Sequence, residues 1–152
     1  MTYESLLTEA DSLGLIVKEV DFKTYDGLCK GNRIGINKNL KTDKEKKCIL
    51  AEEISHYKLT VGDISDLSKI ENMKQEIKAR REGYDKLVGI TRIINAFEHG
   101  VKSLYEMSDF LDVTEEFLED AIKYYKIKYG TYFEIDNYLI CFEPNLQIIK
   151  KF

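Results

Sequence analysis

The sequence has few cysteines, a single proline and no linker-like stretch. Cys29, Cys48 and Cys141 are widely separated, odd in number and form no CxxC pair. This pattern argues against disulfides and against a thiolate metal site, and it is typical of a protein from a reducing cytoplasm. Without a Pro-, Gly- or Ser-rich tract, the chain is expected to form one compact domain or two small subdomains that share a core.

Positive charge and long apolar segments are missing as well. The formal net charge is −4, so the chain has no overall positive field that would attract nucleic acid or anionic lipid. No segment approaches the roughly 18 consecutive apolar residues of a membrane span. The N-terminus also lacks the basic start and apolar core of a secretory signal. We therefore expect a cytoplasmic protein without a membrane partner.

The N-terminal half is predicted to contain a short sheet between helices. Apolar residues at helical spacing predict a helix over 3–13, and short strands are predicted over 15–22 and 27–37. A capping box at Thr42 and Glu45 predicts a longer helix over 43–59.

A second capping box, Ser68 with Glu71, predicts another helix that ends before Gly89. These two long helices and the short sheet are expected to form the first domain, residues 1–95.

The C-terminal third has its own pattern. Ser103 and Thr114 cap two further helices around a tight connection, and Asp136-Asn137 is a good two-residue hairpin turn. Two helices, a tight turn and a hairpin resemble a winged helix-turn-helix. We therefore predict an α+β fold with a winged-helix-like second domain at 96–152.

One stretch of the 43–59 helix has the outline of a metal site. In CILAEEISHYKL, Glu52 and His56 are four residues apart and share one helix face. Glu53 is the next residue along the helix, beside that face. From there a carboxylate can take a proton from a metal-bound water without binding the metal itself. This is the geometry behind the zinc-peptidase pattern H-E-x-x-H, with a carboxylate in place of the first imidazole. On these residues alone, an ordinary solvated helix face remains the alternative.

Several separated segments carry a resemblance to a known family. LAEEISHYKLTVGDI and NMKQEIKARREGYDKLVG, and later FLDVTEEFLEDAIKYYKIKYG and DNYLICFEPNL, match in order the pattern of the ImmA/IrrE metallopeptidases. The chain resembles the branch from phages and mobile elements, in which E-E-x-x-H often replaces H-E-x-x-H. The resemblance implies a minimal zincin-like core, with a short N-terminal sheet and active-site helices, followed by the winged-helix-like subdomain.

The resemblance assigns roles to four residues. It implies that Glu53 is the general base acting on a metal-bound water. It also implies that Glu52, His56 and Glu76 bind one Zn²⁺ per chain. Three other carboxylates are alternatives for the third ligand: Glu71, Glu82 and Asp85.

The surroundings of these residues depart from the family pattern. Ser55 stands where glycine is usual, and Gly83 where alanine is expected. One imidazole and two carboxylates would neutralise Zn²⁺, so a bound water is less acidified and slow activity is expected. Without a metal, Glu52, Glu53 and Glu76 would repel one another, which favours a cation between them.

Two other candidates are assigned structural roles. His99 precedes a glycine at a predicted helix end, where it is expected to meet the terminal carbonyls rather than a metal. Tyr84 falls in the apolar row of its helix and is expected in the core rather than at an oxyanion.

The function that the resemblance implies is a zinc-dependent, site-specific endopeptidase or anti-repressor. Its expected partner is a helix-turn-helix repressor of the same phage or mobile element. One alternative is an inert relative that binds the repressor without cutting it, and another is a DNA-binding regulator. No direct nucleic-acid contact is expected, because four carboxylates at the start of the would-be recognition helix would repel DNA: Glu115, Glu116, Glu119 and Asp120.

Overall fold

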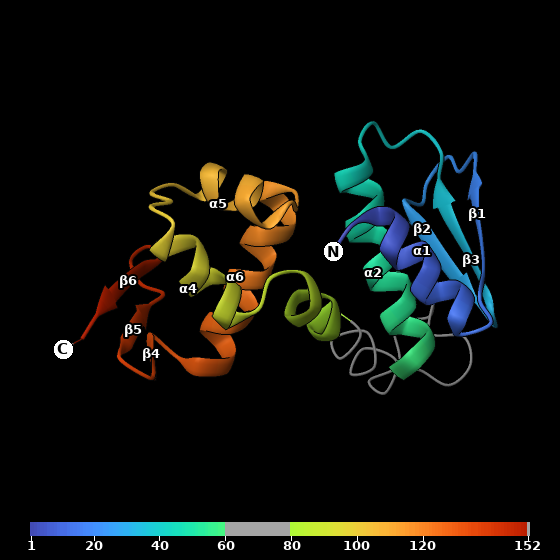
Figure 1. Ribbon diagram of the computed structural model, residues 1–152. Helices are drawn as coiled ribbons and strands as arrows, with labels where there is room; N and C mark the ends of the chain where they lie inside the picture. The colour runs from blue at the N-terminus through green and yellow to red at the C-terminus, as the bar shows by residue number, and fades with distance from the viewer. Residues whose placement is uncertain (60–79, 152) are drawn as a thin grey trace. The chain divides into compact units, whose positions relative to one another are not determined.

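The computed structural model describes residues 1–59 and 80–151, in two compact units, Met1–Leu87 and Val88–Phe152 (Figure 1). The expected ligand Glu76 and its alternative Glu71 lie outside the described residues. So does the predicted helix start at Ser68.

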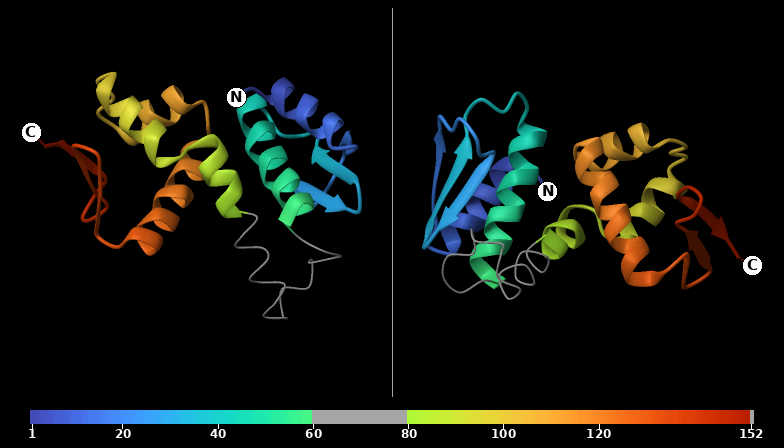
Figure 2. Two further views of the ribbon diagram at one scale, coloured as in Figure 1. Left: turned by 60° about the horizontal axis from the view of Figure 1, so that its bottom comes forward. Right: turned by 180° about the vertical axis from the view of Figure 1, so that it is seen from behind.

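In the described residues of the first unit, a three-stranded sheet has two helices on one face, as Figures 1 and 2 show from several sides. The helical residues 80–87 end this unit. The strand order is β1-β3-β2, with β1 parallel and β2 antiparallel to β3. Strand β2 therefore lies at an edge of the sheet, and α2 packs on β2 and β3. The bounds are α1 (Tyr3–Ser12), β1 (Ile16–Val20), β2 (Gly27–Lys30), β3 (Arg33–Asn37) and α2 (Asp43–Leu59).

Helix α2 has the bounds that its capping residues predict. The Thr42 hydroxyl oxygen accepts a hydrogen bond from Glu45 N at 3.1 Å. The Glu45 carboxylate accepts a hydrogen bond from Lys41 N at 3.2 Å. In the expected capping box this second hydrogen bond would come from Thr42 N, one residue later in the chain. The buried side of α2 includes Leu50 and Ile54, both fully shielded from solvent. This packing holds the helix against the sheet and α1.

The second unit consists of three helices followed by a three-stranded antiparallel sheet, in the order β4-β5-β6. Ser103 and Thr114 cap the second and third helices as predicted, each accepting a backbone hydrogen bond at 3.0 Å. The predicted hairpin forms β4 and β5, with Asp136 at a φ of +50° in the turn. The bounds are α4 (Ile90–Glu98), α5 (Leu104–Leu111), α6 (Glu115–Tyr129), β4 (Tyr132–Ile135), β5 (Tyr138–Cys141) and β6 (Gln147–Lys150).

The second unit begins at Val88 and includes the whole of α4. Ile93 and Ile94 of that helix are buried, and α4 packs on α5. The expected division into residues 1–95 and 96–152 stays a prediction. Strand β6 extends the hairpin to a third strand. Helices and small sheets in these two units confirm the α+β class.

Candidate active site

Helix α2 carries Glu52, Glu53 and His56 within one turn, and all three side chains are half-buried. Because the segment is a continuous α-helix, Glu52 and His56 lie on one face, four residues apart, as the sequence predicts. Glu53 lies next to that face. The helix therefore places one imidazole and two carboxylates side by side.

Glu53 lies against the edge strand β2. A β-carbon added to Gly27 would be 3.2 Å from Glu53 Cγ and 3.3 Å from Glu53 Oε1. The same atom would come within 2.4 Å of Ile49 Cγ2, which is closer than real β-carbons approach. Glycine at position 27 therefore allows α2, and the Glu53 carboxylate with it, to lie directly on the strand.

The pKa of the Cys29 thiol also indicates that the Glu53 carboxylate lies near β2. Burial, followed by the negative charge of Glu53, raises the pKa of the Cys29 thiol from 9.0 to about 11. Residues two apart in a strand point to the same face of a sheet. Gly27 and Cys29 therefore share one face of β2, and the Glu53 carboxylate lies close to that face.

Glu52 lies near a different element, the helical residues 80–87. A β-carbon on Gly83 would be 3.8 Å from Glu52 Cγ and 3.9 Å from its Cα. These are ordinary contacts, so the alanine that is usual at this position would fit. The departure at Gly83 therefore does not alter the spacing between this segment and α2.

Four charged residues connect α1, α2 and the 80–87 segment. Glu9 Oε1 accepts hydrogen bonds from Lys58 Nζ at 2.9 Å and from Lys86 Nζ at 2.5 Å. Lys58 Nζ also lies 3.6 Å from Glu82 Oε1. Burial alone would raise the pKa of the Glu9 carboxyl, but the hydrogen bonds and charges of the two lysines outweigh it and lower the pKa. This network holds the C-terminal part of α2 beside the other two helices.

The remaining candidates have the positions that the sequence suggests. His99 Nδ1 lies 2.8 Å from the Asn95 carbonyl oxygen at the end of α4, which confirms the expected helix-end contact. Tyr84 is 7% exposed, so its assignment to the core is confirmed. Asp85 is exposed, and Glu82 is paired with Lys58.

The donor set on α2 fits a metal ion in part. Glu52 and His56 provide a carboxylate and an imidazole from one helix face, and both are ligand types that zinc accepts. Within residues 1–59 and 80–151, no group of three His, Cys, Asp or Glu side chains is arranged to hold a metal ion. A third ligand from the described part of the chain would need a side-chain position other than the one in this structure.

Sequence reasoning missed the contribution of Gly27 and of the Glu9 network. A glycine inside a predicted strand is a known sign of close backbone approach, and that signal was present at Gly27. Glu9 is 49 positions from Lys58 and 77 positions from Lys86 in the sequence. No local sequence pattern indicates contacts over such separations.

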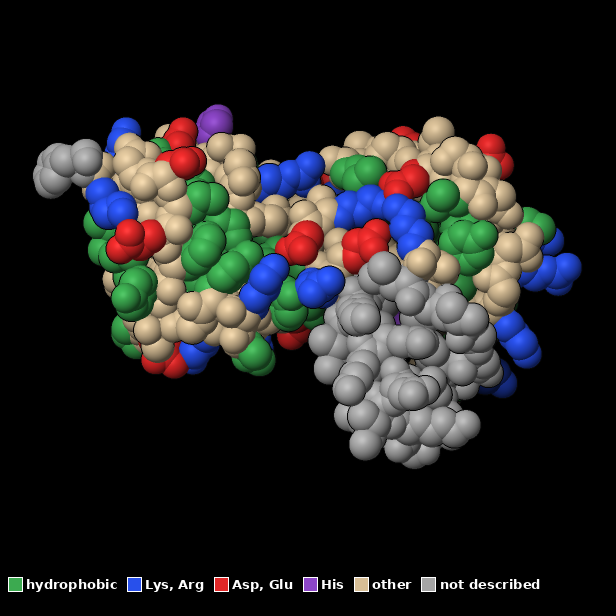
Figure 3. Space-filling model, turned by 90° about the horizontal axis from the view of Figure 1, so that it is seen from below, with side chains coloured by type: hydrophobic (Ala, Val, Ile, Leu, Met, Phe, Trp, Pro, Cys, Tyr) green, Lys and Arg blue, Asp and Glu red, His purple; other side chains and the backbone are tan. Residues whose placement is uncertain are grey.

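The surface charge of the described residues is mixed. Helix α6 begins with Glu115 and Glu116 in its first turn, and the expectation of no direct nucleic-acid contact stays a prediction. On the face in Figure 3, acidic and basic side chains are interspersed among the described residues of both units, and hydrophobic side chains gather on the second unit. In the part of the chain that the structure describes, no helix is both long enough and apolar enough to cross a membrane.

A short sheet with a glutamate- and histidine-bearing helix packed on its edge strand forms the α+β core of the first unit. Residues 10–123 match the family described as the IrrE N-terminal-like domain, a peptidase family. The match covers most of the chain, which belongs to this family. No curated protein and no solved structure matched the chain in the corresponding comparisons.

Proposed function

We propose that the protein is a zinc-dependent, site-specific endopeptidase that acts on a helix-turn-helix repressor of a phage or mobile element and so relieves repression. The main supporting observation is the placement of Glu52, Glu53 and His56 together on α2, inside the segment that matches a peptidase family. Glu53 is turned toward the edge strand β2, and Glu52 toward residues 80–87.

Glu52, His56 and Glu76 are the proposed metal ligands. Glu52 and His56 share one face of α2. Glu76 lies outside the described residues and is proposed because the family resemblance assigns it the third-ligand position. Glu82 is the weaker alternative, because its carboxylate is paired with Lys58.

Zn²⁺ bound by these residues would supply a Lewis acid that polarises the scissile carbonyl and lowers the pKa of water. Glu53 takes a proton from the attacking water as the carbon–oxygen bond forms. The same carboxyl group then gives this proton to the amine that leaves as the peptide bond breaks. The half-buried position of Glu53 on α2, beside β2, suits this exchange.

Strand β2 is the proposed site where the substrate aligns. In the described residues it ends the sheet β1-β3-β2, so an extended peptide can add to its outer edge by backbone hydrogen bonds. Gly27 keeps that edge within reach of the Glu53 carboxylate. A substrate segment paired with β2 would therefore pass close to the general base.

The test is the co-expression of the protein with candidate repressors, followed by mass spectrometry of repressor fragments. Glu53→Gln should abolish cleavage and leave zinc content and the unfolding midpoint unchanged, since only the proton acceptor is lost. Glu116→Gln, on the exposed start of α6, is the matched control and should cleave normally. Full cleavage by Glu53→Gln would overturn the assigned role.

A second candidate is an inert relative that binds the repressor without cutting it. The carboxylate Glu52, in place of the usual first imidazole, favours it, because a neutralised metal site acidifies water less. In that case the Glu53→Gln variant would relieve repression in cells as well as the unaltered protein does. A reporter gene under the repressor separates the two candidates.

A further inference from the structure

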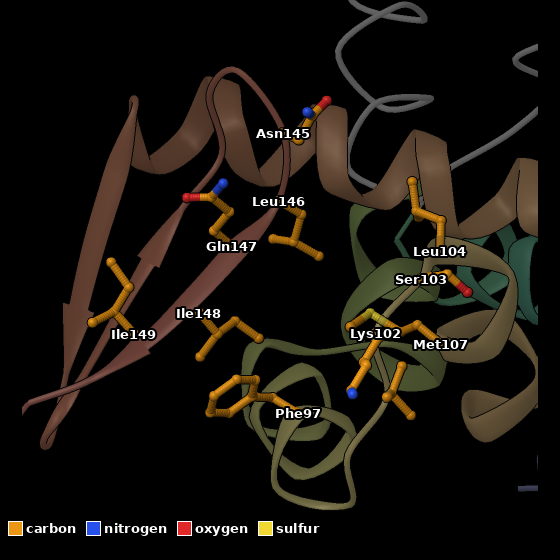
Figure 4. A pocket seen from close by; sticks show the side chains of 11 residues that line it. Phe97, Lys102, Ser103, Leu104, Met107, Asn145, Leu146, Gln147, Ile148 and Ile149 are labelled. Carbon is orange, nitrogen blue, oxygen red and sulfur yellow. The ribbon is translucent and has the colours of Figure 1, made fainter.

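The second unit contains an apolar pocket of about 580 Å³ beside β6. Figure 4 shows the side chains of Phe97, Leu146 and Ile148 around this space. Met107 from α5 also lines the pocket and is 6% exposed. A volume of this size is typical of a ligand-binding cavity.

The pocket follows the edge of strand β6. Residues 146–149 all contribute to its lining. Gln147, Ile148 and Ile149 belong to β6, and successive side chains of a strand point to opposite faces. Three consecutive strand residues border one space where it runs along the strand edge. In the described residues β6 is also the last strand of its sheet, since the order is β4-β5-β6.

The register shows which backbone groups face outward along that edge. Lys151 N donates to Asn137 O at 2.5 Å, which continues the pairing of β6 with β5. Hydrogen-bonded pairs alternate along an antiparallel ladder. The N–H and C=O groups of Ile148 and Lys150 therefore point away from β5, toward the free edge.

Positive charge borders the same edge. Lys102, the one charged residue of the lining, directs its ammonium group into the space in Figure 4. Lys150 is exposed on β6. Neither lysine forms an ion pair with another described residue. Exposed lysines on an edge strand disfavour edge-to-edge pairing with a second copy of this chain. Two ammonium groups beside one edge favour an acidic partner.

We propose that the edge of β6 and its pocket bind an extended peptide segment of a partner protein. The segment adds a strand to β6, inserts apolar side chains at alternate positions beside Phe97 and Ile148, and offers carboxylates to Lys102 and Lys150. This docking does not depend on the proposed peptidase activity. It gives the second unit a role in capturing a partner.

The test uses fluorescence anisotropy of the full chain with the labelled peptide Glu-Thr-Val-Thr-Val-Thr-Glu. Its alternate residues form a row of two valines between two glutamates. The matched peptide Lys-Thr-Val-Thr-Val-Thr-Lys should bind at least tenfold more weakly. Lys102→Glu should weaken binding of the acidic peptide at least tenfold, and added salt should weaken it further.

Two substitutions at one position separate backbone pairing from charge. Lys150→Pro removes an outward N–H without touching the bonds to β5, and it should weaken binding at least tenfold. Lys150→Ala keeps that N–H and should cost less than threefold. Glu53→Gln should bind like the unaltered protein, so failure of docking and failure of catalysis are distinguishable. Thermal unfolding checks that each variant is folded.

Three results would overturn the proposal. One is an acidic peptide whose dissociation constant is above about 1 mM. Another is equal binding to the unaltered protein and to Lys150→Pro. The third is a dimer in sedimentation that Lys150→Pro abolishes, because the edge would then belong to a second copy of the chain.

Discussion

Strands β2 and β6 are both edge strands that lie against helices. The contact at β2 is made by a glycine, whereas large apolar side chains border β6. At β2, a glycine lets α2 approach so closely that the Glu53 carboxylate lies on the strand. At β6, isoleucine and phenylalanine side chains keep an apolar space open between the strand and helices α4 and α5. A close contact positions a reactive group, whereas an open apolar edge provides a place to dock.

Substitutions at β2 should therefore lower the free energy of unfolding more than substitutions at β6. The contact at β2 depends on the absence of a side chain, so the smallest addition overlaps with neighbouring atoms. The edge at β6 has exposed lysines and free space, so it should accept substitutions with little change in stability. The predictions below test the β2 side, beginning with the largest effect.

Gly27→Ala should lower the free energy of unfolding by about 1–3 kcal/mol, the usual range for overpacking. The added β-carbon would lie 2.4 Å from Ile49 Cγ2, so α2 must move away from the strand. Urea unfolding measures the change. The matched control is Gly83→Ala, at a position that faces Glu52 of α2 and where the nearest atom is 3.8 Å away. It should be neutral, or stabilising by up to about 1 kcal/mol as expected for glycine to alanine in a helix. Equal destabilisation by both would contradict the comparison.

Glu9→Gln should destabilise the first unit by about 1 kcal/mol at neutral pH, because the network with Lys58 and Lys86 is only partly shielded from water. The pKa of the Glu9 carboxyl is lowered from 4.5 in the folded chain. Its contribution is therefore complete above pH 4.5 and is lost as the pH falls through the lower folded-state value. Thermal unfolding should show the difference in stability between the unaltered protein and Glu9→Gln becoming smaller on acidification.

The control is Glu4→Gln, which removes an exposed carboxylate from the same helix. A difference in stability between the unaltered protein and Glu9→Gln that grows in acid would exclude the network.

Cys29 should react slowly with iodoacetamide at pH 8, roughly ten- to a hundredfold more slowly than in the urea-unfolded chain. Its raised pKa, about 11, leaves little thiolate. Burial is the larger cause, so Glu53→Gln should speed the reaction only a few-fold, by removing the nearby charge. Peptide mass spectrometry over time follows the rate. No change in Glu53→Gln would mean that the carboxylate lies away from β2.

Much of the local structure could be predicted from the sequence. Helix α2 has its predicted bounds because Thr42 caps it, and α5 and α6 start where Ser103 and Thr114 predict. The helix spacing alone placed Glu52 and His56 on one face. Each of these features depends on residues within a few positions of one another, which is the range over which sequence patterns are reliable.

The remaining features depend on contacts between distant segments. Strand β6 was missed because Gln147–Lys150 is short and becomes a strand by pairing with β5. The approach of Glu53 to Gly27 and the lysine contacts of Glu9 arise only when α2 packs on the sheet and on α1. They are products of tertiary packing. The glycine at position 27 was a sign of close backbone approach but did not identify Glu53 as its neighbour, and the contacts of Glu9 had no local signal.

The most direct test of the proposed function is the zinc content per chain, measured by mass spectrometry after equilibrium dialysis against trace zinc. We predict about one zinc per chain, as in a zinc peptidase site. Glu53→Gln should retain this metal, and His56→Ala should lose it. Zinc binding that is absent, or that is unchanged in His56→Ala, would contradict the account and would leave α2 as a helix without a metal site.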